Sequence, residues 1–470
     1  MSAVQVAILA VAAILLNQLK RGRSLALLGV SALVIYWLQP VQEPANLTFW
    51  FPTLTLAVTV ISWLVTSAPE ARDWRRNWRA VAVLAGIILL VDLNRYFQVN
   101  YLFISDTPRV QLVLAALIGF VGINLVLARL QRFQAILLVL TMISLIVALV
   151  ILKTPSVLER LIETAAGLRG KDAGETSALA WLGFSYVAFR LMHTILDRRA
   201  GRLPSATLSE YVNYVIFFPA FTAGPIDRFE RFVRNLNEPV VLDQDGWLDA
   251  GTRLFVGLFK KFVLADGLAW FALNNVFAPN IQSVAWMWIL LYSYSLRIYF
   301  DFSGYTDIAI GLGRLLGVRL PENFNAPYFK PNLTQFWNSW HMTLTQWFRS
   351  YFFNPLTRAM RSVKRPLPQP LMVFVVQVST MILIGLWHGV TWGFLFWGLW
   401  HGIGLFIHNR WSEWSRVHPP VWSTTRLGGA VLNYSGIFLT FHYVTLGWLF
   451  FFLPDPVFAW EIMRRLFGAA

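Results

Sequence analysis

The sequence predicts an all-α, polytopic transmembrane protein with about eleven membrane-spanning helices. The composition is strongly apolar, since 57% of the residues are hydrophobic and only 13% are charged, whereas soluble domains contain about 25% charged residues. Uncharged windows close to the ~20 residues that cross a hydrocarbon core recur along the chain. Two proline-punctuated aromatic stretches lie between them and predict re-entrant or interfacial amphipathic helices.

The uncharged windows give the individual spans. The clear candidates are residues 1–19, 24–39, 46–69, 110–128, 133–152, 284–296, 366–409 and 427–454. The window 366–409 is long enough for two spans. Shorter or charge-interrupted candidates are 80–91, 176–195 and 251–273. The first window has no charged residues before it and no small-residue cleavage site, so we expect a helix there and not a signal peptide.

The two irregular stretches are residues 217–229 and 321–331. Irregular backbone at membrane depth is tolerated only where protein or a water-filled space surrounds it. The second stretch leads into a predicted amphipathic helix over 333–353. The residues that share one face of this helix by spacing are Trp337, His341, Thr345 and Phe348.

The basic residues predict the orientation in the membrane. The net charge is +15, but the cations form short clusters between apolar windows, which fits the positive-inside rule better than a nucleic-acid surface. The clusters expected in the cytoplasm are Lys20–Arg23, Arg72–Arg79, Arg129–Arg132 and Arg198–Arg202. The loop 153–177, where acidic residues offset the basic ones, falls on the other side. This alternation places the N-terminus outside the cytoplasm.

The residues present exclude sites that depend on cysteine and argue against a histidine metal site. The chain has no cysteine, which excludes disulfides, thiolate metal sites and an acyl-cysteine intermediate. His401 and His408 lie seven residues apart on one predicted helix, whereas a helical zinc pair is spaced i, i+4. We therefore expect no metal site and no tightly bound cofactor.

The chain divides into three regions that differ in how many polar residues lie within or beside the apolar segments. Residues 1–175 contain few polar groups within the windows and predict scaffold helices. Residues 176–410 place charged residues, histidines, glycines and prolines within or beside apolar segments, and ionisable groups at membrane depth usually face a cavity. Residues 411–470 predict a C-terminal helix and tail.

His388 and His341 are the candidate catalytic residues. His388 stands in an uncharged run, and a histidine has a pKa suited to general base work. The 47 residues between the two histidines are enough for one loop and one span to bring them together. Packing of His388 against a neighbouring helix is an equally open interpretation.

Other polar residues favour structural roles. Asp301 is spaced to pair with Arg297 one helical turn earlier. Lys260 and Lys261 are expected to extend toward the cytoplasm. A proton relay that includes Arg190, Asp301 and His388 would instead indicate a transporter, although no internal repeat supports one.

Six segments, in order, resemble the membrane-bound O-acyltransferase superfamily. The resemblance is to the bacterial branch of alginate O-acetyltransferase and the D-alanyl transfer protein of teichoic acid modification, and it covers roughly residues 177–410. The segments are FFPAFTAGPIDRFERF, GLFKKFVLAD, YFDFSGYTDIAIGLGRLLG, LPENFNAPY, FWNSWHMTLTQWFR and GLWHGVTWGFLFWGLWHG. The first is closer to the D-alanyl members and the second to the acetylases.

The resemblance implies an O-acyltransferase with His388 as the catalytic histidine and His341 as the second one. It implies transfer of a small acyl group from a cytoplasmic thioester donor, either acetyl-CoA or an acyl carrier protein. The acceptor would be a hydroxyl of an extracytoplasmic polysaccharide or glycolipid. The alternatives are D-alanyl-type transfer to a cell-wall polymer, a non-enzymatic transporter, and a membrane anchor for a soluble acylation partner. The expected location is the bacterial plasma membrane, with the lipid bilayer, the acyl donor and an extracytoplasmic acylation protein as partners and no nucleic acid.

Overall fold

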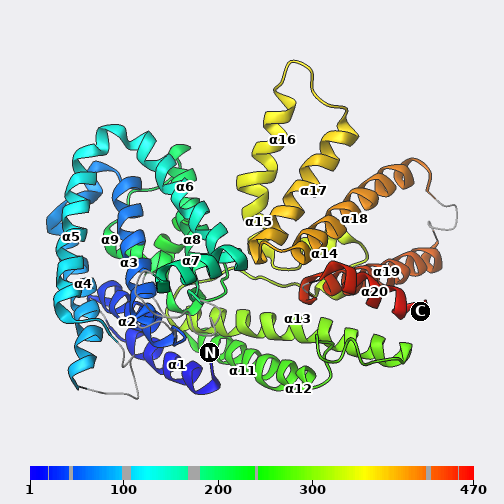
Figure 1. The fold of residues 1–470 in the computed structure, drawn as a ribbon, viewed down its shortest axis with the longest axis horizontal. Helices are drawn as coiled ribbons and strands as arrows, with labels where there is room; N and C mark the ends of the chain where they lie inside the picture. Colours follow the sequence, from blue (N-terminus) through cyan, green and yellow to red (C-terminus); the bar gives the residue numbers. More distant parts are fainter. Residues whose placement is uncertain are drawn as a thin grey trace. The chain divides into compact units, whose positions relative to one another are not determined.

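The computed structural model describes residues 1–19, 21–41, 46–97, 107–167, 180–238, 242–419, 425–453 and 455–469, and every regular element in these ranges is helical (Figure 1). The chain forms two compact units. Unit 1 contains Met1–Phe255 and Asp307–Pro321, and unit 2 contains Val256–Thr306 and Glu322–Ala470. Lys20 and residues 168–177 of the predicted outside loop lie outside the described residues.

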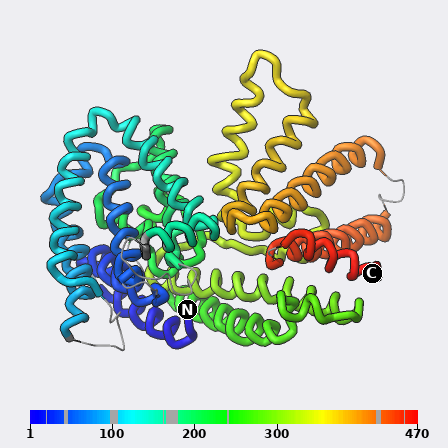
Figure 2. Tube along the Cα trace, in the orientation of Figure 1, coloured from blue at the N-terminus to red at the C-terminus, as the bar shows by residue number. Residues whose placement is uncertain are grey.

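Unit 1 is built from the N-terminal helices, which Figure 2 traces from blue to green. They are α1 (Ala3–Asn17), α2 (Arg23–Leu38), α3 (Leu47–Thr66), α4 (Trp74–Phe97), α5 (Val110–Arg129), α6 (Gln134–Lys153), α7 (Pro155–Gly167), α8 (Phe184–Arg199), α9 (Leu208–Ile216), α10 (Phe229–Asn237) and the start of α11 (Gln244–Leu258). The side chains of α8 and α9 are mostly buried. These two helices therefore form much of the core of unit 1.

The irregular stretch predicted at 217–229 is buried inside unit 1. It contains a short 3-10 turn, η3 (Phe218–Ala220), whose residues are fully enclosed. The buried guanidinium of Arg190 donates hydrogen bonds to the carbonyls of Val215 and Ala220, at 2.6 and 2.7 Å. A buried carbonyl without a partner costs about 1–3 kcal/mol, so this arginine stabilises a stretch whose own backbone hydrogen bonds are limited to short turns.

Unit 2 carries the C-terminal helices, the last residues of α11 and, up to Thr306, the helix that begins at Val284. Its elements are the π-helix η4 (Phe259–Ala265), α12 (Asp266–Ala269), α13 (Val284–Leu315), η5 (Pro327–Phe329), α14 (Leu333–Trp337), α15 (Met342–Phe348), the π-helix η6 (Arg349–Phe353), α16 (Asn354–Arg361), α17 (Gln369–His388), α18 (Trp392–Val417), α19 (Arg426–Phe452) and α20 (Pro456–Leu466). The buried hydroxyl of Tyr328 joins three of them. It donates to the carbonyl of Ser295 at 2.8 Å and accepts the indole N–H of Trp448 at 3.3 Å.

Five helical segments in the described part of the chain are long and apolar enough to cross a membrane. They are Leu47–Thr66, Trp74–Tyr96, Val110–Lys153, Gln369–His388 and Arg426–Phe452. Two shorter apolar helices, Ala3–Asn17 and Arg23–Leu38, precede them. The described part of the chain is therefore all-helical and contains helices suited to a membrane.

The single amphipathic helix predicted over 333–353 is wrong. The structure breaks this segment into α14, α15 and η6, and His341 stands between the first two helices. The side-chain carbonyl of Asn323 accepts hydrogen bonds from the backbone N–H and the hydroxyl of Thr343, in the first turn of α15, at 3.1 and 2.9 Å. Because α15 begins at Met342 and His341 precedes it in a left-handed conformation, the i, i+4 spacing does not place His341 on the face of one helix.

Candidate functional site

His388 is the last residue of α17 and precedes a tight connection to α18. Thr391 begins α18, because its hydroxyl accepts a hydrogen bond from the backbone N–H of Phe394 at 3.4 Å. Three residues therefore separate the two helices, and His388 lies at the closed end of the α17–α18 hairpin. Its side chain is half-buried.

Glycines hold the two helices of this hairpin in close contact. A Cβ atom added to Gly398 of α18 would lie 2.7 Å from the Cα of Ile382 in α17, and one added to Gly402 would lie 2.9 Å from the Cα of Val378. Real Cβ atoms do not approach other atoms so closely, so only glycine permits this helix spacing. Small residues at a helix interface are the usual means of close packing in a membrane.

Aromatic rings surround His388 on several sides. The ring centroids of Trp387 and Phe451 lie 4.5 and 4.8 Å from the imidazole, and that of Trp397 lies 5.7 Å away. Edge-to-face contacts of this kind contribute about 0.5–1.5 kcal/mol each between aromatic pairs. The imidazole is therefore held by packing while part of it stays accessible.

His341 is more deeply buried and has an unusual backbone conformation. Only 4% of its surface is exposed. Its φ of 43° and ψ of 52° lie in the left-handed region, which histidine adopts more often than most residues but which still costs energy. Strained backbone of this kind clusters at functional sites.

The two histidines contact the same indole. The imidazole of His341 packs edge-to-face on Phe302 of α13, with centroids 4.6 Å apart, and lies 6.1 Å from Trp387. Trp387 in turn contacts His388. Residues far apart in the sequence thus meet within unit 2, one histidine buried and the other accessible.

Burial also affects the protonation of His341. In the sequence it stands between α14 and α15, outside the long apolar helices, and desolvation lowers the pKa of His341 to about 3. The imidazole is therefore neutral near pH 7. A neutral ring has one N–H donor and one nitrogen acceptor, so it can position a carbonyl or a hydroxyl without carrying charge.

Comparison with known proteins identifies this arrangement. The sequence profile of MBOAT, the membrane-bound O-acyltransferase family, matches residues 123–453. The chain belongs to this family. It is therefore an acyltransferase, in line with the acyltransferase names of its relatives.

The relatives of this MBOAT chain modify polymers of the bacterial cell envelope. A teichoic acid D-alanyltransferase from Streptococcus thermophilus is 33% identical, over 60% of this chain and 71% of the relative. A probable alginate O-acetylase from Pseudomonas aeruginosa is 32% identical, over 62% of this chain and 52% of the relative. A peptidoglycan O-acetyltransferase from Helicobacter pylori is 32% identical, over 55% of this chain and 46% of the relative. The match thus spans about half of the length of the two acetylating relatives.

The sequence did not single out His401 as a neighbour of the MBOAT site. Its ring is fully buried between Trp337 and Trp397, each with its centroid 5.0 Å away, and Trp397 also contacts His388. The i, i+4 spacing of Trp397 and His401 on α18 is the signal that predicts a shared face.

His408 has a different partner, the hydroxyl of Thr334 at 3.1 Å. Across the described residues, no His, Asp and Glu side chains gather as a metal site.

Asp301 has another partner than the one expected. The spacing predicted a pair with Arg297 one turn earlier. In the structure the carboxylate of Asp301 pairs instead with Lys261 of η4. Helix η4 approaches α13 closely because Gly304 has no side chain. A Cβ there would lie 2.8 Å from the backbone nitrogen of Lys261. The nearby carboxylate of Asp307 pairs with Arg253.

Proposed function

We propose that this chain transfers a small acyl group from a cytoplasmic thioester donor to a hydroxyl of an extracytoplasmic polysaccharide or glycolipid. The observation that carries the proposal is the pair of histidines at Trp387, one buried and neutral and the other half-exposed. A general base must reach the acceptor hydroxyl, and the accessible His388 suits this role. The enclosed His341 suits a carbonyl-binding role.

The reaction then proceeds by direct transfer. The acceptor hydroxyl oxygen attacks the thioester carbonyl carbon while His388 takes the hydroxyl proton. His341 donates a hydrogen bond to the oxygen on which negative charge develops. The carbon–sulfur bond breaks, an ester bond forms, and the proton on His388 passes to the leaving thiolate. The absence of cysteine supports this route over an acyl-cysteine intermediate.

Two acyl groups have support. Acetyl or a similarly small group is the main proposal, supported by the segment GLFKKFVLAD, which is closer to the acetylases in the resemblance described above. D-alanyl transfer from a carrier protein is the second candidate, supported by the D-alanyltransferases of Streptococcus thermophilus and Bacillus subtilis, of which the match covers 71% and 69%. An extracytoplasmic acylation protein is the further partner that we propose for either chemistry.

The arrangement in the membrane is part of the proposal. We infer about eleven spans, including short apolar helices such as Ala3–Asn17 and Arg23–Leu38, and an N-terminus outside the cytoplasm. Residues 1–175 would act as scaffold, 176–410 as the catalytic core and 411–470 as the C-terminal helix and tail. The support is the alternation of basic clusters along the sequence.

Loss of the donor thioester tests the function. We expect purified protein in lipid nanodiscs to consume acetyl-CoA or an acetylated or D-alanylated carrier protein, and to do so faster when a polysaccharide acceptor is added. A transporter would move substrate across vesicles without consuming the thioester. An anchor would consume none until its soluble partner is added. Ester formation with only one of the donors would identify the acyl group.

The donor is proposed to meet a basic cluster at the end of α16. Arg358, Arg361, Lys364 and Arg365 are all exposed, and both an acyl carrier protein and a phosphate-bearing coenzyme are anionic. Replacing all four by glutamine should raise the apparent KM for the donor at low salt and leave kcat nearly unchanged, because exposed charges mainly steer association. The difference should shrink at physiological salt, where the Debye length is ~8 Å.

A second basic cluster provides the control for this prediction. Arg75, Arg76 and Arg79 on α4 are also exposed and are expected in the cytoplasm. Their replacement by glutamine should leave the KM unaltered. An equal effect of both sets, or no effect of the first in correctly oriented protein, would mean that the α16 cluster serves topology alone.

A further inference from the structure

An uncharged helical hairpin in unit 2 carries an apolar hollow at its tip. Residues 267–296 contain no Asp, Glu, Lys, Arg or His. They form the end of α12, the connection 270–283 and the first part of α13. Large apolar side chains stand exposed on this segment, with Trp270 81% and Trp286 57% exposed.

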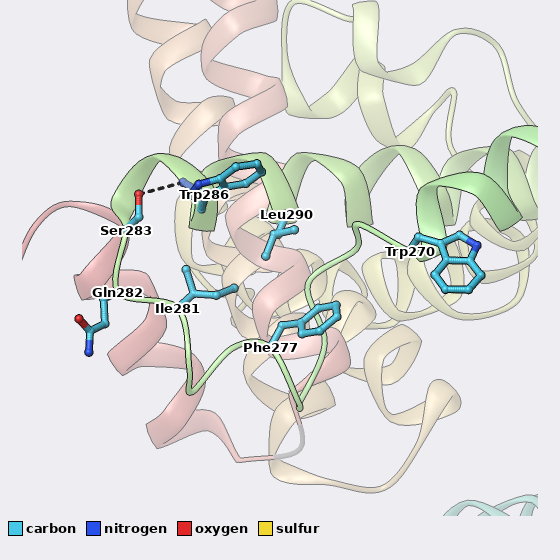
Figure 3. A pocket seen from close by; sticks show the side chains of 7 residues that line it. All are labelled: Trp270, Phe277, Ile281, Gln282, Ser283, Trp286 and Leu290. Carbon is cyan, nitrogen blue, oxygen red and sulfur yellow. Dashed lines mark hydrogen bonds between the residues drawn. The ribbon is translucent and has the colours of Figure 1, made fainter.

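The hollow measures about 410 Å³, within the ~300–1,000 Å³ of small-molecule sites. Figure 3 shows the apolar side chains around it and the polar Gln282 and Ser283 on the stretch that leads into α13. The residues that line the hollow are Trp270, Phe277, Ile281, Gln282, Ser283, Trp286 and Leu290. An apolar hollow with an amide and a hydroxyl beside it matches a lipid chain whose polar end lies near those groups.

Hydrogen bonds hold the irregular connection in place. The side chain of Asn274 accepts from the backbone N–H groups of Val276 and Phe277, both at 2.9 Å. Arg465 of α20 donates to the carbonyls of Ala278 and Ile281. The hollow is therefore a built feature of the hairpin.

Charged groups flank the uncharged segment on both sides. Arg465 lies at the connection, and Arg297 is the first charged residue of α13, about 20 Å from Val284 at 1.5 Å per residue. One turn further on, about 26 Å from Val284, Asp301 pairs with Lys261 of η4, and the hydrocarbon core is ~30 Å thick. Charges at one boundary of the core and tryptophans with amide side chains at the other are the pattern of a membrane-crossing hairpin.

We propose that the tip of this hairpin lies at the lipid headgroup boundary and that its hollow binds one acyl chain of a bilayer phospholipid. The chain would lie against Trp286, Phe277 and Leu290, and the glycerol and ester region would lie near Gln282 and Ser283. In water, this group of exposed apolar side chains would favour aggregation. Contact with lipid covers the same side chains and removes that tendency. The inference does not depend on the acyl-transfer chemistry proposed above.

The absence of native cysteine makes the depth measurable. Spin labels are attached to Trp286→Cys and Val276→Cys in vesicles of phospholipid alone. For each label, we measure the ratio of its collision rate with oxygen to its collision rate with a water-soluble nickel chelate. This ratio should be at least fivefold higher than for a label on Val363→Cys. Val363 is an exposed control that stands beside Lys364 and Arg365. Equal ratios at all three sites would place the tip in water. Protection of the tip from both reagents would mean that protein covers it. Either result overturns the proposal.

Lipid retention tests the hollow itself. Native mass spectrometry of wild-type protein from the same vesicles should show a bound phospholipid that Ile281→Trp loses, because the larger ring fills the hollow. Ile289→Trp is the matched control, since Ile289 lies on the same hairpin but does not line the hollow. It should keep the wild-type lipid number, and both variants should elute as wild type in size-exclusion chromatography. Equal lipid numbers in the two variants would overturn the proposed chain site, even if the spin labels report a membrane location.

Discussion

Replacing His388 by alanine should reduce acyl transfer by ~10²-fold or more while leaving expression and detergent stability close to wild type. General base catalysis contributes ~10²–10⁴-fold in rate, and the proposed route offers no other base for the acceptor hydroxyl. His388 is half-buried at a helix end, so its loss removes less packing than the loss of a core residue. The measurement is the initial rate of ester formation at saturating donor, together with the thermal midpoint of the same preparation.

His408→Ala is the matched control for this prediction. His408 lies in the same unit and hydrogen-bonds to Thr334, away from Trp387. Its replacement should keep activity within about tenfold of wild type. If His388→Ala also kept activity within that range, the general-base role would be wrong, whereas inactivity of both variants with lowered midpoints would indicate a folding defect.

Gly398→Ala should destabilise unit 2 by about 1–3 kcal/mol, the usual cost of overpacking. The added methyl group would lie 2.7 Å from both the Cα of Ile382 and the carbonyl oxygen of Met381, and both are backbone atoms that cannot rotate away. The helices α17 and α18 must therefore separate. Because Trp397 of α18 contacts His388 of α17, activity should fall together with the thermal midpoint.

Gly86→Ala separates this effect from the general consequence of replacing a helical glycine. A Cβ at Gly86 of α4 meets no atom within 4 Å. Alanine favours a helix over glycine by about 0.5–1 kcal/mol, so this variant should be as stable as wild type or slightly more so. A Gly398→Ala protein with an unchanged midpoint would show that the hairpin tolerates a wider spacing than its backbone contacts suggest.

The helical membrane fold and the family were predictable from the sequence, because they rest on local apolar windows and on ordered blocks of residues. The predicted roles of His388 and His341 stay predictions, although the structure places both beside Trp387. The surroundings of His341 were not predictable. The spacing suggests one helix, whereas the structure begins a second helix at Met342, with Asn323 bonded to Thr343 in its first turn, and leaves His341 before it in a left-handed conformation.

The partner of Asp301 shows the same difficulty. The i, i+4 rule sees only Arg297, but Lys261 is brought to Asp301 by a π-helix that packs closely against Gly304. Residue spacing predicts contacts along one helix. It does not predict contacts between helices whose approach depends on a missing side chain.

The hydroxyl of Tyr328 also sets an order of assembly during synthesis. Its acceptor, Ser295, precedes it in the chain, but its donor, Trp448, follows 120 residues later. At 5–20 residues per second, roughly 6–24 s pass on the ribosome before this third partner exists. Helix α13 and the Tyr328 turn must therefore remain competent for docking while α17 and α18 are made and inserted. The core of unit 2 closes only when α19 arrives.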